Sequence, residues 1–193
     1  LGVKVGPGIP HTAVPEDAEA QWVSVDGTVV EAGLWFGPLA PEGPGRSALV
    51  LHGETARTLA GDGSRGAVGP LAGYLYEPDG AVIRAGLVGT LATHLEGNLL
   101  DPTIAYVTCE APSSAGEGLA AGYRVLDSMP FNVKRLRAYL RERGVGRITV
   151  KKRGTAVTPE QLRSQLALRG EGSATLVLTR IAGAQHVLVV EAL

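Results

Sequence analysis

The chain has 193 residues, 45% of them hydrophobic, and a formal net charge of −1 at pH 7. Its single cysteine excludes an internal disulfide, and no apolar run approaches the roughly 20 residues that a membrane-spanning helix needs. The sequence shows no secretory leader, so these features together predict a soluble protein of the reducing cytoplasm.

The charge is divided unevenly along the chain. Residues 130–193 hold twelve Lys/Arg and four Asp/Glu, a net charge of +8, whereas residues 1–129 carry a net charge of −9. Such a division is typical of a module that binds a polyanion and is attached to something else. The concentrated positive charge is the electrostatic pattern expected of a nucleic-acid surface.

The first residue also bears on how much of a protein the chain represents. The only methionine is Met129, so Leu1 does not correspond to ordinary initiation. Residues 1–5 already predict a buried strand, with no leader before it. We therefore expect the chain to be the C-terminal piece of a longer protein.

Short strands and long loops are predicted for the first half of the chain, which holds most of the 27 Gly and 12 Pro. The alternating segments 21–25 and 28–32 flank the pair Asp26-Gly27. This pair favours a type I′ hairpin turn, because both central positions need a positive φ.

A strand at 47–52 and a glycine-rich loop at 53–70 are predicted to lead into a helix capped by Asp79. Residues 103–109 predict a strand in which Cys109 is a buried structural thiol. The buried stripe of the helix recurs every four residues and consists of Ile83, Leu87, Leu91 and Leu95.

The basic part of the chain predicts alternating strands and helices. A strand at 123–127 is stopped by Pro130, and Asn132 caps a helix that runs to about Arg143, with Gly144 as its terminator. The elements that follow are a strand at 147–153, a helix opened by the capping box Thr158–Gln161 and ended by Gly170, and a hairpin of 175–181 with 187–190. The order β-α-β-α-β-β predicts a two-layer α/β sandwich.

The cations of this part indicate how it functions. Lys134 and Arg135 lie in the first helical turn, where the macrodipole is positive and a surface cation costs about 0.3–1 kcal/mol. A bound phosphate would reverse the sign, because free N–H groups, dipole and cations all favour an anion. The neighbouring strand adds a second basic face. We therefore predict RNA binding by Lys134, Arg135, Arg137, Arg141, Lys151, Lys152 and Arg153.

Contact with phosphates is the predicted mode of binding. Tyr139 is the only aromatic residue within the basic stretch, which argues against a base-stacking platform. Backbone and shape readout of structured RNA, such as tRNA or rRNA, fits the composition better. Two alternatives remain open. One is a module that docks a protein partner or the ribosome without catalysis, and the other is a basic face that only covers the protein's own acidic half.

The sequence predicts no catalytic or metal-binding constellation. The stretch 61–66 contains Gly-x-Gly, but we expect it to lack the preceding strand and following helix of a nucleotide-binding turn. The four histidines are scattered along the chain and lack the spacing of a metal site: His11, His52, His94 and His186.

The run 130–154, PFNVKRLRAYLRERGVGRITVKKRG, resembles the THUMP-like C-terminal domain of bacterial class I S-adenosylmethionine-dependent methyltransferases. The similarity continues through Pro159-Glu160, 168–170 and 174–180. Further segments that resemble stretches of the same proteins are 29–36 and 77–86, and 3–8 resembles the fifth strand of the methyltransferase sheet and its exit loop.

This resemblance implies an α/β chain with the C-terminal strands of a Rossmann-like methyltransferase domain at 1–53, a connecting helical and loop segment at 54–118, and a basic THUMP-like domain at 119–193. The S-adenosylmethionine loop and the catalytic stretch of the family lie upstream, so no cofactor residue is implied here. At most, Lys4 and Pro7 would lie near the substrate end of that site. The chain would supply the RNA-binding module of an S-adenosylmethionine-dependent RNA methyltransferase.

Overall fold

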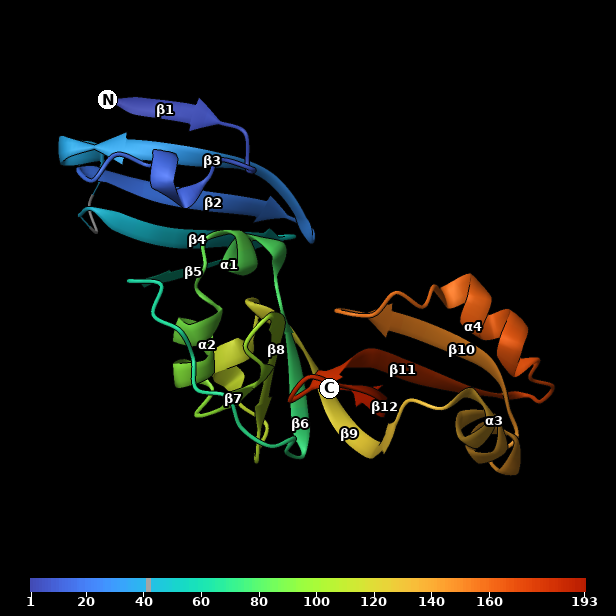
Figure 1. Ribbon diagram of the computed structural model, residues 1–193. Coiled ribbons are helices and arrows are strands. Elements are labelled where there is room, and N and C mark those ends of the chain that lie inside the picture. Colours follow the sequence, from blue (N-terminus) through green and yellow to red (C-terminus); the bar gives the residue numbers. More distant parts are fainter. Residues whose placement is uncertain (41–42) are drawn as a thin grey trace.

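Two mixed β-sheets organise the computed structural model, which describes residues 1–40 and 43–193 (Figure 1). The first sheet has the strand order β1-β3-β2-β4-β5 and the second has the order β10-β11-β12-β9-β6-β8-β7. The strands of the first sheet are β1 (Gly2–Val5), β2 (Ala18–Val25), β3 (Thr28–Phe36), β4 (Gly45–His52) and β5 (Thr55–Gly61).

The tight turn between β2 and β3 is the hairpin that the sequence predicts. Asp26 and Gly27 have φ values of 48° and 79°, and Val25 pairs with Thr28 across the turn. Two residues with positive φ define the type I′ geometry. This local prediction is confirmed.

The ends of this sheet differ from expectation. Strand β1 is present, but its predicted burial is wrong, because it lies at the sheet edge and exposes Gly2, Val3 and Lys4. The predicted loop 53–70 contains strand β5, which pairs antiparallel with β4. Only Leu59 of β5 is buried, so the strand carries almost none of the hydrophobic pattern that would have identified it.

The single helix predicted after Asp79 is two short helices, α1 (Gly80–Arg84) and α2 (Val88–His94). Asp79 is the cap, as predicted, because its Oδ1 accepts a hydrogen bond from the Ala81 N–H at 2.8 Å. The chain turns between the helices at Gly86, whose φ is 71°. The predicted stripe survives the break, since Leu87, Leu91 and Leu95 are buried and Ile83 is half-buried.

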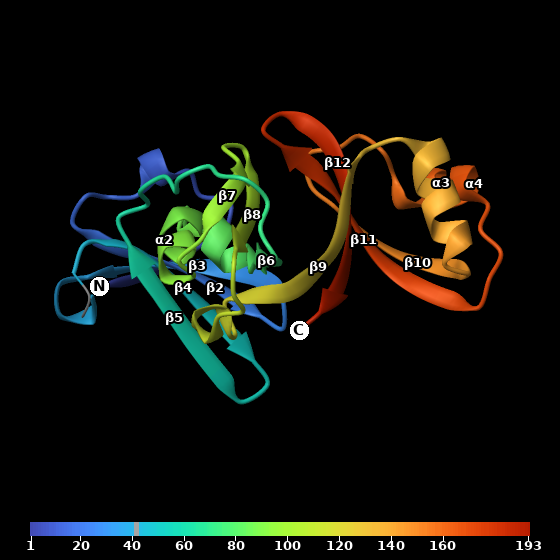
Figure 2. The same cartoon turned by 90° about the horizontal axis from the view of Figure 1, so that it is seen from below.

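The second sheet unites the middle of the chain with its basic end. Its strands are β6 (Tyr74–Pro78), β7 (Asn98–Asp101), β8 (Ile104–Cys109), β9 (Ala120–Pro130), β10 (Val145–Lys152), β11 (Gly172–Ile181) and β12 (Ala184–Ala192). Strand β9 pairs with β6 through residues 120–124 and with β12 through residues 123–130. Figure 2 shows β9 curving from one part of the molecule to the other.

Three hydrophobic cores result from this arrangement. The first lies between the five-stranded sheet, α1 and α2, and the outer face of β6 and β8, and it includes Trp22, Leu91 and Val107. The second lies beneath the helices α3 (Val133–Glu142) and α4 (Pro159–Leu166). The third lies within the curl of the seven-stranded sheet, where Leu75 and Tyr106 meet residues of β11 and β12. The curl brings β7 against the β11–β12 turn, and the Ala182 N–H donates to the carbonyl of Leu100 at 3.1 Å.

Helices α3 (Val133–Glu142) and α4 (Pro159–Leu166) cover one face of the C-terminal strands. Asn132 caps α3 and the capping box at Thr158 opens α4, as predicted. Helix α4 ends earlier than predicted, because Ala167 rather than Gly170 adopts the left-handed conformation. The observed order β9-α3-β10-α4-β11-β12 is the predicted two-layer arrangement. No helix within the described residues is long and apolar enough to cross a bilayer.

Asp101 ties the two arms of the curled sheet together. Its Oδ1 accepts hydrogen bonds from the N–H and hydroxyl of Thr103 at 2.9 and 2.7 Å, and its Oδ2 accepts from the Gly183 N–H at 3.0 Å. The Thr103 bonds, followed by the Gly183 bond and the charge of Arg180, lower the pKa of Asp101. The buried carboxylate therefore stabilises the fold above its ordinary pKa of 3.8, and this contribution is lost as the pH falls through the lowered folded-state value.

We expect Asp101→Asn to lower the free energy of unfolding near neutral pH by about 1–3 kcal/mol, because the Gly183 N–H loses its carboxylate partner. The difference from the wild type should shrink as the pH falls below the ordinary carboxyl value of 3.8. Urea unfolding at neutral and at acid pH measures both effects. Glu142→Gln, at an exposed carboxylate, serves as the control, and a pH-independent Asp101→Asn deficit would contradict the role of the ionised form.

Candidate functional site

The seven predicted RNA-binding residues have three different environments. Lys134 and Arg135 are exposed in the first turn of α3, which contains no acidic residue, and Lys152 is exposed at the end of β10. Within residues 1–40 and 43–193, these three side chains have no hydrogen bond and no carboxylate within 4.0 Å. We call Lys134, Arg135 and Lys152 the open cations.

The strand register shows that the open cations share one edge of the domain. Lys152 pairs with Leu178, Leu178 with Val187, and Val187 with Met129. Strand β10 therefore ends at the level where β9 leads into α3. With neighbouring strands about 4.8 Å apart, the row from Lys152 to Met129 is about 14 Å wide.

Arg137 and Arg141 form hydrogen bonds that connect α3 with the end of α4. One turn apart on α3, they donate to the backbone carbonyls of Gln165 and Ala167, the latter at 3.3 Å. The last carbonyls of a helix lack intrahelical partners and carry the negative end of the dipole, so cations are favoured there. These arginines therefore stabilise the end of α4.

Two further arginines, Arg147 and Arg163, make the same kind of contact. Arg147 donates to the carbonyl of Glu171 at 2.8 Å, and Arg163 donates to that of Ile148 at 3.4 Å. The sequence could not predict this role, because every residue has a backbone carbonyl and the residue type does not show which carbonyl will accept a bond from an arginine.

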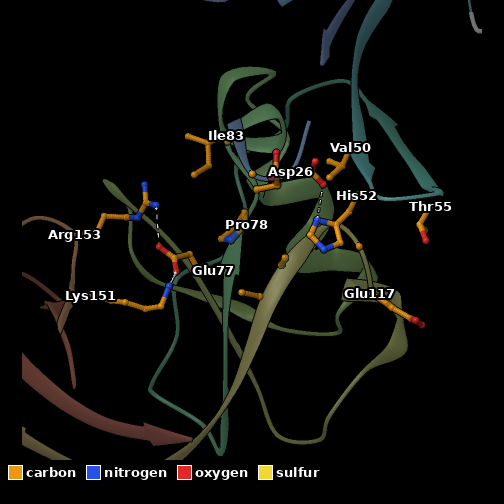
Figure 3. A pocket seen from close by; sticks show the side chains of 16 residues that line it. Asp26, Val50, His52, Thr55, Glu77, Pro78, Ile83, Glu117, Lys151 and Arg153 are labelled. Carbon is orange, nitrogen blue, oxygen red and sulfur yellow. Dashed lines mark hydrogen bonds and ion pairs between the residues drawn. The ribbon is translucent and has the colours of Figure 1, made fainter. Parts of the chain in front are cut away.

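Lys151 and Arg153 are already paired with a carboxylate. Glu77, at the end of β6, accepts from Lys151 Nζ at 2.7 Å and from Arg153 at 3.4 Å (Figure 3). The same cations lie 5.4 Å from the ring centroid of Tyr123 and 5.5 Å from that of Tyr106, respectively. We call these five residues the ion cluster. Its two cations are half-buried and paired with a carboxylate, whereas the open cations are exposed to solvent.

The protonation states of the ion cluster follow from its surroundings. Burial alone would lower the pKa of Lys151, but its bonds with Glu77 and Tyr123 outweigh this effect and raise the pKa above the usual value. Burial and the charge of Glu77 raise the pKa of Tyr106 to about 12. Near neutral pH the ammonium is therefore charged and the phenol neutral.

The ion cluster borders a cavity of about 780 Å³ between the five-stranded sheet and β9 (Figure 3). Two of its carboxylates are occupied, since Asp26 pairs with His52 at 3.2 Å and Asp79 caps α1. The four histidines remain apart, and the described residues contain no group of three metal-ligating side chains.

The described residues do not complete a glycine-rich nucleotide-binding turn. The stretch 61–66 does follow a strand, contrary to expectation, because β5 ends at Gly61. However, β6 rather than a helix is the next element, so the phosphate-type turn is incomplete. Lys4 pairs with Glu31 at 2.5 Å, and the Pro7 carbonyl accepts from the Trp22 indole at 3.1 Å.

Comparison with known proteins gives this geometry a context. Residues 120–192 match the family model described as THUMP domain-like. The chain is 34% identical over 183 residues to proteins named uncharacterized S-adenosylmethionine-dependent methyltransferase in two strains of Mycobacterium tuberculosis. The alignment covers 93% of this chain and 49% of each relative, so the chain spans about half the length of the curated relatives it matches.

A solved structure supports the fold. The crystal structure of a candidate methyltransferase from Porphyromonas gingivalis superposes with a TM-score of 0.75 at 22% identity, over 98% of this chain and 50% of that one. At this identity the likeness concerns the mixed α/β fold alone. Together, the comparisons show that residues 120–192 form a THUMP-like domain in a chain related to proteins named S-adenosylmethionine-dependent methyltransferases.

Proposed function

We propose that this chain is the RNA-binding part of an S-adenosylmethionine-dependent RNA methyltransferase. The five-stranded sheet would be the C-terminal end of the Rossmann-like domain, and residues 119–193 would be the module that holds tRNA or rRNA. The remainder of the protein would supply the cofactor site and the methyl transfer. Support comes from the THUMP-like match and the names of the relatives.

One observation carries the proposal. The first turn of α3 holds two exposed cations and no acidic residue, and a third cation ends β10 on the same edge. For stability alone, acidic residues are favoured in a first turn, and cations are unfavourable there. Phosphates bound at this edge would be stabilised by the helix N–H groups and by the open cations together.

The side-chain contacts favour a smaller set of residues for RNA binding than the seven predicted. The open cations would be the primary phosphate contacts, and Arg137 and Arg141 would add to the positive field while holding α4. Lys151 and Arg153 are assigned to the ion cluster instead, because Glu77 neutralises part of their charge.

We expect RNA affinity to fall steeply with salt. If the open cations neutralise about three phosphates, the slope of log affinity against log salt should be about −2 to −3. Lys134→Ala, Arg135→Ala or Lys152→Ala should each reduce the slope by about 1. Fluorescence anisotropy with a labelled tRNA transcript in a potassium chloride series measures this. If the transcript does not bind even at low salt, the protein- or ribosome-docking alternative is favoured.

Two adjacent lysines separate RNA binding from a purely structural role. Lys152→Glu should weaken RNA binding by about tenfold and leave the urea unfolding midpoint unchanged, because Lys152 is an open cation. Lys151→Glu should lower the midpoint instead, because it places a second carboxylate beside Glu77. If both variants only destabilise the protein, the basic face is structural and the RNA proposal is wrong.

A further inference from the structure

A second recess lies at the opposite edge of the THUMP-like domain from the open cations. It is a groove of about 720 Å³ at the amino ends of β10 and β11, beside the second half of α3. Its volume is within the range of about 300–1,000 Å³ that small-ligand sites occupy. Among the residues that line the groove are Leu126, Asp127, Tyr139, Arg143, Thr149 and Thr175.

A stacked guanidinium forms one wall of the groove. The central carbon of the Arg143 guanidinium lies 3.6 Å from the centroid of the Tyr139 ring, and Arg143 also donates to the Tyr139 carbonyl at 3.2 Å. The Arg143 side chain is 51% exposed, so the ring covers only part of the guanidinium. Its pairing with exposed Glu142 is long, at 3.9 Å.

A β-bulge shapes the rim of the groove. Val189 pairs with Asp127 and Val190 with Val125, so Leu126 is an extra residue of β9 without a partner on β12. Bulges of this kind re-aim side chains and are frequent beside functional sites. Leu126 is 53% exposed, an apolar side chain directed to solvent at the mouth of a polar groove.

The remaining wall offers polar groups. Thr149 and Thr175 line the groove, and within the described part of the chain their hydroxyls take part in no hydrogen bond. The Asp127 carboxylate adds acceptors, although it already accepts from the Ser128 N–H at 2.7 Å and lies against the Tyr139 hydroxyl. A flat ligand with donors and acceptors along its edge would find partners here.

We propose that this groove binds an unpaired nucleobase of the RNA, a proposal that rests on the proposed function. The base stacks on the exposed part of the Arg143 guanidinium, since bases stack on guanidinium planes as they do on aromatic rings. Leu126 covers one end of the base, and the hydroxyls and Asp127 meet its edge. The shortage of aromatic residues does not prevent stacking, because the guanidinium supplies the second plane.

The test compares two RNA duplexes of the same sequence, one fully paired and one with a single bulged nucleotide. Wild-type protein should bind the bulged duplex about tenfold more tightly. Arg143→Lys keeps the charge and removes the planar group, so it should abolish this preference and change affinity for the paired duplex by less than about twofold. Lys134→Ala is the matched control, and it should weaken both duplexes equally.

A direct readout accompanies the affinities. With 2-aminopurine as the bulged base, its fluorescence should change on binding to the wild type and not on binding to Arg143→Lys. If the wild type shows no preference for the bulge, or if Arg143→Lys retains it, the groove is not a base site, although binding of the paired duplex still supports the proposed function. If neither duplex binds, both proposals fail.

Discussion

Backbone hydrogen bonding along β9 is the constraint on which the rest of the molecule depends. This strand pairs with β6 on one edge and with β12 on the other, and residues 123 and 124 take part in both ladders. The acidic middle of the chain and its basic end are therefore parts of one sheet. The curl of that sheet encloses the Leu75 and Tyr106 core and brings β10 close enough to β6 for Glu77 to reach two cations.

The lysines and arginines of this domain serve three purposes. Arginines of α3 satisfy carbonyls at the end of α4, Lys151 and Arg153 are held by Glu77, and the open cations meet solvent. Net charge alone does not separate these cases. What separates them is the acceptor within reach of each side chain, and it differs between adjacent residues such as Lys151 and Lys152 because neighbouring side chains on a strand point to opposite faces.

Local rules made much of the fold predictable from sequence. The Asp26-Gly27 turn, the Asn132 cap and the Thr158 capping box involve residues within four positions of one another, and each is present. Failures arose where the decisive partner is distant or has no side-chain signature. Strand β5 depends on pairing with β4. The break between α1 and α2 depends on the positive φ of Gly86, which the hydrophobic pattern of the helix does not reveal. Glu77 lies 74 residues before Lys151, so no pattern in the basic stretch could reveal their pairing.

The double role of β9 also bears on how this region can be studied. The THUMP-like match begins at Ala120, yet β9 is hydrogen-bonded to β6, which lies well before that residue. A fragment that starts at the family boundary would leave one side of β9 without its neighbour and would uncover Leu188 and Val190 of the enclosed core. Bare strand edges beside apolar surface promote self-association. The boundary of sequence similarity and the boundary of a cooperative folding unit are therefore different places in this protein, and excision experiments need to begin at or before β6.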